Sequence, residues 1–225
     1  MKLFIWDDIG FVERMSHTEN GDLLVVNAAR CSFDKEHTEF KEKGDTRLIN
    51  YLAREKHLLP FRHPQLTLRM HMPIFILRQL GKHQTGFSWS EVSRRYISGE
   101  PEVYRPENLR KYAEDKKQGS SDEVLTEHLE ENSFWILDAA TNKSVVAYNA
   151  LMRAGVAPEQ ARMVLPQSMY TTVVVTGSLL GWHHLYTQRT EQHTQLETQY
   201  FAKIVGQICE ETFPVSWNAL TTHTS

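Results

Sequence analysis

The chain has 225 residues, a formal net charge of −3 at pH 7 and 40% hydrophobic residues. A chain of this length buries about 70% of its unfolded surface and needs no disulfide or metal to fold. The nearly balanced charge argues against a surface that attracts nucleic acid. The two cysteines, Cys31 and Cys209, lie far apart and outside any Cys-x-x-Cys spacing, which argues against a disulfide scaffold and fits a reducing cytoplasm.

The first residues, MKLFIWDDIG, do not combine a basic segment with the ~7–15-residue apolar core of a secretory signal. No apolar run approaches the ~20 residues that span a bilayer. We therefore expect a soluble cytoplasmic protein that contacts neither a membrane nor nucleic acid.

The first half of the chain shows a helix, a strand and a second helix. Residues 47–56 (RLINYLAREK) have apolar side chains at helical spacing. Residues 65–72 alternate strictly, which is typical of a half-buried strand. The apolar face of this strand comprises Leu66, Leu68, Met70 and Met72. Pro73 ends the strand, and residues 74–83 are predicted to form a helix.

The second half begins with residues 99–119, whose prolines, glycines and mixed charges indicate irregular surface structure. Ser120, with Glu123 three positions later, resembles a capping box, so a long helical region is predicted from there to about Ala154. Residues 158–166 (PEQARMVLP) are predicted to form a short helix closed by Pro166.

Two further elements complete the expected fold. Residues 169–176 (MYTTVVVT) are rich in β-branched side chains, which favours a buried strand. Residues 179–212 read as amphipathic helix in two pieces. Helices between non-adjacent strands indicate an α+β fold, and we expect residues 1–225 to form a single domain.

Residues 88–96 (SWSEVSRRY) combine arginines, hydroxyls and a carboxylate, which suit a phosphate and a sugar but also a solvated helix face. Arginine recurs in apolar helical settings, at Arg78, Arg95, Arg162 and Arg189. A dry arginine needs an anionic partner, either a protein carboxylate or a bound ligand, and both alternatives stay open.

No familiar catalytic motif accounts for these arginines. The chain contains no GxGxxG, GxxxxGK[ST], HExxH or GxSxG sequence. Both cysteines are expected to be small, buried side chains and not nucleophiles. His183, His184 and His193 have no carboxylate or cysteine at ligand spacing, so we expect no metal site.

From about Phe11 to Phe213 the chain resembles the flavin-dependent thymidylate synthases. The resemblance rests on seven segments in chain order: ARCSFD at 29–34, LPFRH at 59–63, PIFILRQ at 73–79, SWSEVSRRY at 88–96, ARMVLP at 161–166, YTTVVVT at 170–176 and QRTEQHTQLE from 188. It implies a methyltransferase of dTMP biosynthesis with a mostly antiparallel central sheet flanked by helices. It also implies a homotetramer with active sites shared between subunits.

The resemblance further implies the reaction and its residues. A reduced FAD would mediate between methylenetetrahydrofolate and dUMP, and NADPH would reduce the flavin again. The implied catalytic residues are Arg189, which would stabilise negative charge on the uracil, and His57. The implied dUMP-binding residues are Gln79, Glu91, Ser93, Arg94, Arg95, Arg162 and Arg189. The implied FAD-binding residues are Lys82, His83, Gln84, Ser178, His184 and His193.

The chain departs from the family pattern mainly on the flavin and folate side. The Arg-His-Arg triplet reads Lys82-His83-Gln84, and eight residues instead of seven separate it from Ser93. Lysine keeps the charge of arginine but loses its bidentate fork. The other departures are Arg62 for an acidic residue, Ser90 for Asn, Ser178-Leu179-Leu180 for Asn-x-Arg, and His184 for Asn.

Two alternatives to a thymidylate synthase remain open. One is a pyrimidine nucleotide hydroxymethylase that uses the same cofactors, in which water replaces hydride in the last step. The other is a nucleotide-binding homologue without redox activity, because a shared fold does not guarantee shared chemistry.

Overall fold

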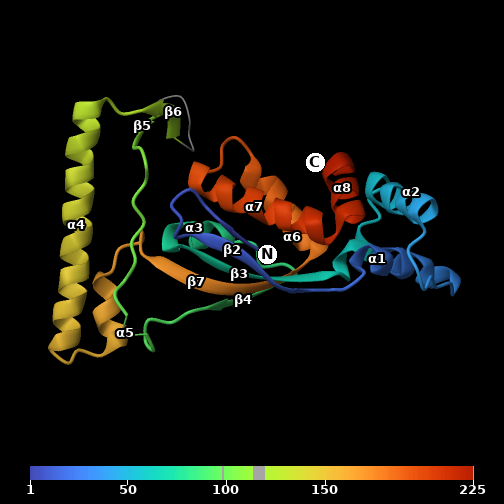
Figure 1. Ribbon diagram of the computed structural model, residues 1–225, viewed down its shortest axis with the longest axis horizontal. Coiled ribbons are helices and arrows are strands. Elements are labelled where there is room, and N and C mark those ends of the chain that lie inside the picture. Colours follow the sequence, from blue (N-terminus) through green and yellow to red (C-terminus); the bar gives the residue numbers. More distant parts are fainter. Residues whose placement is uncertain (98, 114–119, 225) are drawn as a thin grey trace. The chain divides into compact units, whose positions relative to one another are not determined.

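The computed structural model describes residues 1–97, 99–113 and 120–224 (Figure 1). The strands are β1 (Lys2–Phe4), β2 (Phe11–His17), β3 (Gln65–Pro73), β4 (Phe87–Glu91), β5 (Arg110–Tyr112), β6 (Ser120–Val124) and β7 (Tyr170–Ser178). The helices are α1 (Gly21–Arg30), α2 (Glu42–Arg54), α3 (Ile74–Leu80), α4 (Glu127–Arg153), α5 (Pro158–Ala161), α6 (Leu179–Thr190), α7 (Leu196–Thr212) and α8 (Pro214–His223). Short 3-10 turns cover Cys31–Phe33, Leu59–Arg62 and Arg162–Val164.

The chain divides into two compact units. Unit 1 comprises Met1–His71, Gln79–Ser90 and Val173–Ser225, and unit 2 comprises Met72–Arg78 and Glu91–Thr172. One sheet has the strand order β1-β2-β3-β7-β4, and β5 and β6 form a separate pair. The fold is thus α+β with a mostly antiparallel central sheet, as the sequence indicates.

The β3 strand shows why the sheet is buried on one face. Its apolar face, Leu66, Leu68, Met70 and Met72, is fully buried, whereas the alternate positions from Gln65 to His71 are exposed or partly exposed. In unit 1, β2 pairs antiparallel with β3 and places Val12 opposite Met70. Helices α6 and α7 lie side by side, and α7 packs against β2 (Figure 1). The buried face of these strands is therefore the core of unit 1.

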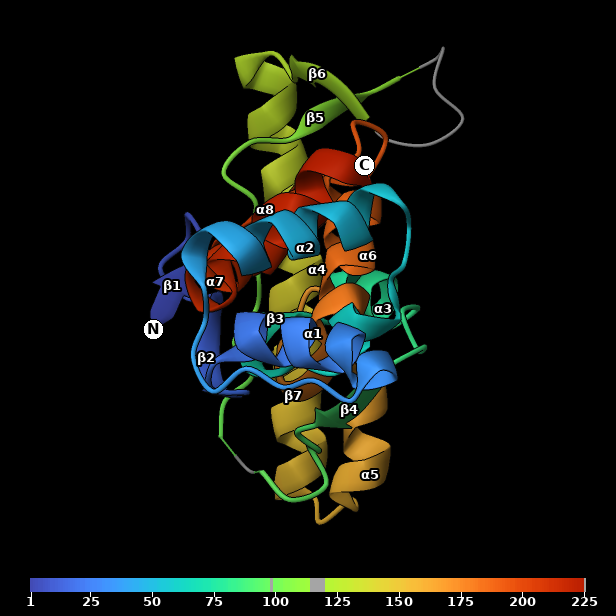
Figure 2. The same cartoon turned by 90° about the vertical axis from the view of Figure 1, so that its right-hand side faces the viewer.

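Helices α1, α2 and α8 form a second helical group in unit 1 (Figure 2). Pro214 opens α8, and the next two amides lack intrahelical acceptors because they belong to its first turn. Asp22, in the first turn of α1, accepts from Val215 N–H at 3.1 Å and Ser216 N–H at 2.9 Å. This carboxylate caps α8 and fixes it to α1.

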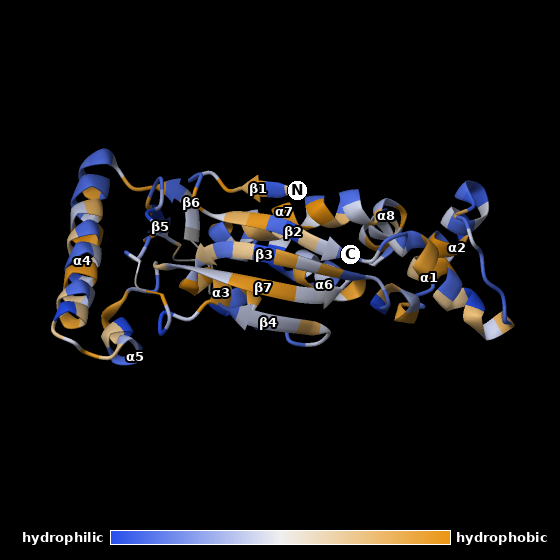
Figure 3. Cartoon of the chain, turned by 60° about the horizontal axis from the view of Figure 1, so that its bottom comes forward, coloured by the Kyte–Doolittle hydropathy of each residue, from blue (hydrophilic) through white to orange (hydrophobic). Residues whose placement is uncertain are grey.

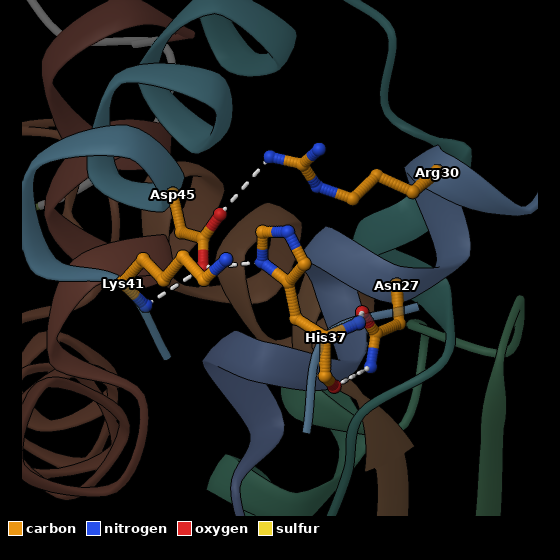
Figure 4. A network of polar contacts seen from close by, with 5 residues as sticks. All are labelled: Asn27, Arg30, His37, Lys41 and Asp45. Atoms are coloured by element: carbon orange, nitrogen blue, oxygen red, sulfur yellow. Dashed lines mark hydrogen bonds and ion pairs between the residues drawn. The ribbon is translucent and has the colours of Figure 1, made fainter. Parts of the chain in front are cut away.

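Asp45 ties the segment before α2 to α1 (Figure 4). Its buried carboxylate accepts from Arg30 Nη2 at 3.1 Å, His37 Nδ1 at 3.0 Å and the Lys41 N–H at 2.8 Å. The side chain of Asn27 accepts from His37 N–H and donates to the His37 carbonyl, each at 2.9 Å. Burial alone would raise the pKa of this carboxyl, but the Lys41 amide, His37 and Arg30 outweigh burial and lower the pKa.

In unit 2 the long helix begins later than the sequence predicts. Residues 120–124 form β6, which pairs antiparallel with β5, and α4 begins at Glu127. Glu123 therefore pairs with Lys111 across the two strands at 2.8 Å instead of capping a helix. Residues 114–119 of the expected irregular segment lie outside the described residues, and part of the remainder forms β5.

Most other expected elements are confirmed. The helices around residues 48–54 and 74–80, the short helix after Pro158, the strand from Tyr170 and the two-piece helix from Leu179 are all present. Residues 88–91 lie in β4, so a solvated helix face is wrong for this part of SWSEVSRRY. No predicted element corresponds to α1, α8, β1 or β2.

Candidate active site

Arg189 lies near the C-terminal end of α6, in unit 1. Its Nε donates to His83 Nε2 at 3.0 Å, and its Nη2 donates to the Gln79 carbonyl at 3.0 Å. The Gln79 carbonyl can accept from Arg189 because α3 ends at Leu80, so this carbonyl lies in the last turn and has no i+4 donor within the helix. The partly buried guanidinium is thereby fixed by two acceptors that carry no negative charge.

The guanidinium of Arg189 retains donors for a ligand. A guanidinium has more N–H groups than the two bonds to His83 and Gln79 use. Within the described residues, no carboxylate forms an ion pair with Arg189. The Nη1 and Nη2 end of the group can therefore offer a planar fork to a carbonyl or an anion.

His83 is a neutral hydrogen-bond acceptor in this arrangement. Burial lowers the pKa of His83 to about 4, with further contributions from the charges of Arg189 and His184. At neutral pH its Nε2 accepts from Arg189, so the remaining proton must lie on Nδ1. The contact between Arg189 and His83 thus carries a single positive charge, that of Arg189.

The side chain of Gln79 contacts α7. Its Oε1 accepts from Thr198 Oγ1 at 3.0 Å, and its Nε2 donates to Gln195 Oε1. Thr198 is fully buried. Gln79, an expected nucleotide-binding residue, therefore joins α7 through its side chain and Arg189 through its backbone.

Four of the expected flavin-binding residues are exposed, and a fifth is buried. Lys82, Gln84, His184 and His193 are exposed. Partial burial of the His184 ring, together with the charge of Arg62, lowers the pKa of His184. Ser178 is only 7% exposed, and its Oγ accepts from Gly181 N–H at 3.2 Å. The Ser178 hydroxyl is thus the N-cap of α6.

The loop between α3 and β4, where the sequence departs from the resembled family, is mostly exposed, and Phe87 at its end is packed. Gln84 is exposed and donates from Nε2 to the Gly81 carbonyl. Phe87 packs edge-on against Trp182, with ring centroids 4.8 Å apart. A Cβ at Gly177 would lie 2.4 Å from the Phe87 ring, so only glycine admits this ring. The longer loop is therefore anchored by an aromatic side chain.

Glu91 belongs to unit 2, at the end of β4. Its Oε1 accepts from Thr171 Oγ1 at 2.9 Å, and Thr171 on β7 is 6% exposed. The adjacent backbone is fixed as well, because Val92 N–H donates to the Thr172 carbonyl at 2.8 Å. The Glu91 carboxylate is exposed but has a defined orientation.

The serine and arginines that follow Glu91 lie in a turn of unit 2. Ser93 Oγ accepts from Arg95 N–H at 3.3 Å and Arg95 Nε at 3.4 Å. Arg94 donates to the carbonyls of Gly99 and Glu100. Arg78, Arg95 and Arg162 are exposed, so the dry setting expected for them is wrong. The charges of Arg95, in this turn, and of Arg162, in the 3-10 turn Arg162–Val164, are therefore accessible to a phosphate.

His57 follows α2 in unit 1, and backbone bonds fix its position. Lys56 N–H donates to the Ala53 carbonyl at 3.1 Å, and His57 N–H donates to the Leu52 carbonyl at 2.8 Å. Lys56 has φ 57°, so this is a Schellman ending with lysine in place of glycine. The His57 side chain is exposed and lies edge-on to Tyr51, with ring centroids 6.0 Å apart.

We expect Lys56→Gly to stabilise the protein by about 0.5–1 kcal/mol, because the left-handed conformation is strained for lysine and open to glycine. Thermal unfolding should show a Tm about 1–4 °C higher. Lys43→Gly, inside the first turn of α2, is the control and should lower Tm. A Tm that does not rise in Lys56→Gly would contradict the strain argument.

A cavity of about 560 Å³ lies beside α1 in unit 1. This volume is in the range of ligand pockets, about 300–1,000 Å³. Its lining residues are Leu24, Asn27, Ala28, Cys31, Asp34, Lys35, Glu36 and His63. Cys31 is exposed here, contrary to expectation, because the 3-10 turn after α1 faces outward. Cys209 is buried as expected, and burial raises the pKa of its thiol.

The described residues contain no group of three or more His, Cys, Asp and Glu side chains that could hold a metal ion. In the same part of the chain, no helix combines the length and the apolar character needed to cross a membrane.

Known proteins with similar sequences and structures all point to one family. The family model described as "Thymidylate synthase complementing protein" matches residues 14–215. The flavin-dependent thymidylate synthase of Thermus thermophilus is 34% identical over 216 residues, which cover 96% of this chain and 77% of that protein. The enzyme of the same name from Thermosipho africanus is 34% identical over 212 residues, 94% of this chain and 91% of that protein.

A solved structure resembles nearly the whole chain. It is a UMP/dUMP methylase, PolB from Streptomyces cacaoi, bound with 5-Br dUMP, with a TM-score of 0.83 and 29% identity over 95% of each chain. Its complex with 5-Br UMP gives a TM-score of 0.82 and 27% identity. The sequence match over residues 14–215 and the shared α+β fold lead to one conclusion: the chain belongs to the thymidylate synthase complementing protein family.

Proposed function

We propose that the chain is a flavin-dependent thymidylate synthase, which converts dUMP to dTMP with FAD, methylenetetrahydrofolate and NADPH. The observation that carries this proposal is the Arg189 guanidinium, fixed by His83 and Gln79 with part of its fork left for a ligand. The relatives named flavin-dependent thymidylate synthase and the neighbour bound to 5-Br dUMP support it.

Arg189 binds the uracil in this proposal. Its charge stabilises the negative charge that develops on a pyrimidine carbonyl oxygen as C5 becomes nucleophilic. Neutral His83 accepts from Arg189 and therefore does not compete with it as a second cation. His57 is the second proposed catalytic side chain. The nucleotide is bound through its phosphate, sugar and ring by Gln79, Glu91, Ser93, Arg94, Arg95 and Arg162.

The proposed flavin-binding residues fit an anionic diphosphate in chemical type. Lys82 supplies an exposed charge, and Gln84, His184 and His193 supply exposed nitrogen atoms. The buried Ser178 hydroxyl accepts from Gly181 N–H as the cap of α6, and this bond uses its oxygen and not its O–H group. When bound, a flavin would supply the redox chemistry of the methylation.

UMP is a second candidate substrate, because the solved neighbour is named a UMP/dUMP methylase. The test is incubation of the protein with dUMP or UMP, methylenetetrahydrofolate, FAD and NADPH, followed by mass spectrometry of the nucleotide. We expect dTMP from dUMP. A 5-hydroxymethyl product would favour the hydroxymethylase, and nucleotide binding without any product would favour the homologue without redox activity.

Thr171→Val is expected to weaken dUMP binding about 3- to 15-fold, because Glu91 loses the hydroxyl that orients its carboxylate. Titration calorimetry with dUMP would measure the effect. Thr171→Ser keeps the hydroxyl and should bind like the wild type. Equal affinity in Thr171→Val and Thr171→Ser would show that this hydrogen bond does not matter for binding.

We propose that the protein assembles as a homotetramer with shared active sites. Hydrophobic positions recur along the long helix α4 (Figure 3). Those with exposed side chains include Leu129, Trp135, Ile136 and Val146. Such a surface favours contact with another subunit.

Sedimentation velocity should give four times the mass of one chain, and Trp135→Glu should shift the protein toward smaller species. Tyr112→Glu is the matched control, because Tyr112 is 83% exposed and lies outside α4. A monomeric wild type, or equal effects of Trp135→Glu and Tyr112→Glu, would contradict assembly through α4.

A further inference from the structure

Gln79 connects α7 to the candidate catalytic arginine. Both polar atoms of its side-chain amide are used by α7, because Thr198 Oγ1 donates to Oε1 and Gln195 Oε1 accepts from Nε2. Its backbone carbonyl accepts from Arg189 Nη2 at 3.0 Å. One residue at the end of α3 thus receives contacts from α6 and α7.

The α7 side of this connection is rigid. Thr198 is fully buried, and its N–H donates to the Gln195 carbonyl at 2.9 Å, so the two residues share the first turn of α7. A buried hydroxyl needs a hydrogen-bond partner, and the Gln79 amide supplies it. Rotation of Gln79 away from α7 would leave the buried Thr198 hydroxyl unpaired, which is unfavourable.

The orientation of the Arg189 guanidinium depends on the position of the C-terminal end of α3. The Gln79 carbonyl also accepts from Lys82 N–H at 3.3 Å, in the turn that leads to His83. Both acceptors of the guanidinium, the Gln79 carbonyl and His83 Nε2, therefore belong to the turn that the Gln79 side chain anchors. A shift of this turn would move both acceptors at once.

We propose that Gln195 and Thr198 are positioning residues, which hold Gln79 so that its carbonyl and His83 aim the Arg189 guanidinium. This rests on the proposed function in one respect, namely that Arg189 acts on the pyrimidine ring. Neither α7 residue contacts Arg189 directly in the described hydrogen bonds. Their effect on the reaction passes through Gln79.

The test replaces Thr198 with Val, which keeps its shape and removes its hydroxyl. Thr198→Val should lower kcat for dUMP roughly 10- to 100-fold, with KM changed less than about threefold, because the misplaced guanidinium affects the transition state most. Thr198→Ser retains a hydroxyl and should restore wild-type turnover. Thr194→Val is the matched control, since the Thr194 hydroxyl donates to the Gln188 carbonyl and not to Gln79.

A second readout does not depend on turnover. NMR titration of labelled histidines follows His83, whose pKa is lowered to about 4 by burial, Arg189 and His184. If Arg189 moves away in Thr198→Val, the pKa of His83 should rise, while Thr198→Ser and Thr194→Val should titrate like the wild type. A wild type without turnover would contradict the proposed function, and the titration would still decide the positioning role.

Unchanged kcat and unchanged His83 titration in Thr198→Val would overturn the proposal, as would equal losses in Thr198→Val and Thr194→Val. If Thr198→Val does not fold, Gln195 provides the same test. Gln195→Glu keeps an acceptor for Gln79 Nε2, whereas Gln195→Met removes it. Only Gln195→Met should then lower kcat and raise the pKa of His83, and equal behaviour of the two variants would overturn the proposal.

Discussion

Arg189→Ala will reduce kcat for dUMP by about 100- to 1,000-fold, the loss typical when a preorganised charge at a developing oxyanion is removed. The reason is geometric: Arg189 is aimed by His83 Nε2 and the Gln79 carbonyl, and the alanine variant offers no donor in its place. Single-turnover measurement of dTMP formation at saturating dUMP would show the effect on the chemical step. The affinity for dUMP should change less than kcat.

Two further variants separate charge from shape. Arg189→Lys keeps a cation but loses the planar fork, so its kcat should lie between those of Arg189→Ala and the wild type. Arg153→Ala removes an exposed arginine at the end of α4 and should leave turnover unchanged. Wild-type kcat in Arg189→Ala would refute the proposed catalytic role.

The spacing of apolar residues predicted those elements whose buried side chains recur at regular intervals along the chain. The strict alternation of residues 65–72 identified β3, and the apolar spacing after Leu179 identified α6 and α7. The Ser120 capping box was misleading because a strand partner competes for the same residues. Residues 120–124 pair with β5, and that pairing depends on residues about ten positions earlier, which a local pattern does not include.

The contacts within the candidate site were harder to predict from the sequence than the fold. Arginine-rich segments suggested anion binding, but no local pattern pairs Arg189 with Gln79, which lies 110 positions away. The resemblance to a known family singled out both residues. The neutral acceptor His83, the buried cap Ser178 and the contacts of Gln79 with α7 became visible only from packing, since each depends on which helices meet.

Asp45 illustrates the same limit, because nothing in its local sequence marks it as a buried charge. It lies in the first turn of α2, where a carboxylate is favourable near the helix N-terminus. The structure surrounds it with Arg30, His37 and the Lys41 amide (Figure 4). The segment that it fixes, residues 31–41, supplies one wall of the cavity beside α1.

Asp45→Ala will destabilise the protein by about 3–5 kcal/mol, the typical cost of leaving the partners of a buried charge unpaired. Urea unfolding followed by circular dichroism would measure this loss as a lower midpoint at unchanged m-value. Glu42→Gln is the matched control, because Glu42 is an exposed carboxylate in the same helical turn. Loss of the Glu42 charge should lower the free energy of unfolding by no more than about 1 kcal/mol.

The pH dependence of this destabilisation is a further test of the Asp45 carboxylate. Because its folded pKa is lowered from 3.8, its stabilising contribution is complete above pH 3.8 and is lost as the pH falls through the folded value. The difference in the free energy of unfolding between the wild type and Asp45→Ala should therefore become smaller at acidic pH. His83 and His183, whose pKa values are each lowered to about 4 by burial and nearby charge, reduce the stability of both proteins alike as the pH falls from 6.5. A destabilisation as small as that of Glu42→Gln, or one that does not narrow in acid, would mean that the charge of Asp45 is not what holds the segment in place.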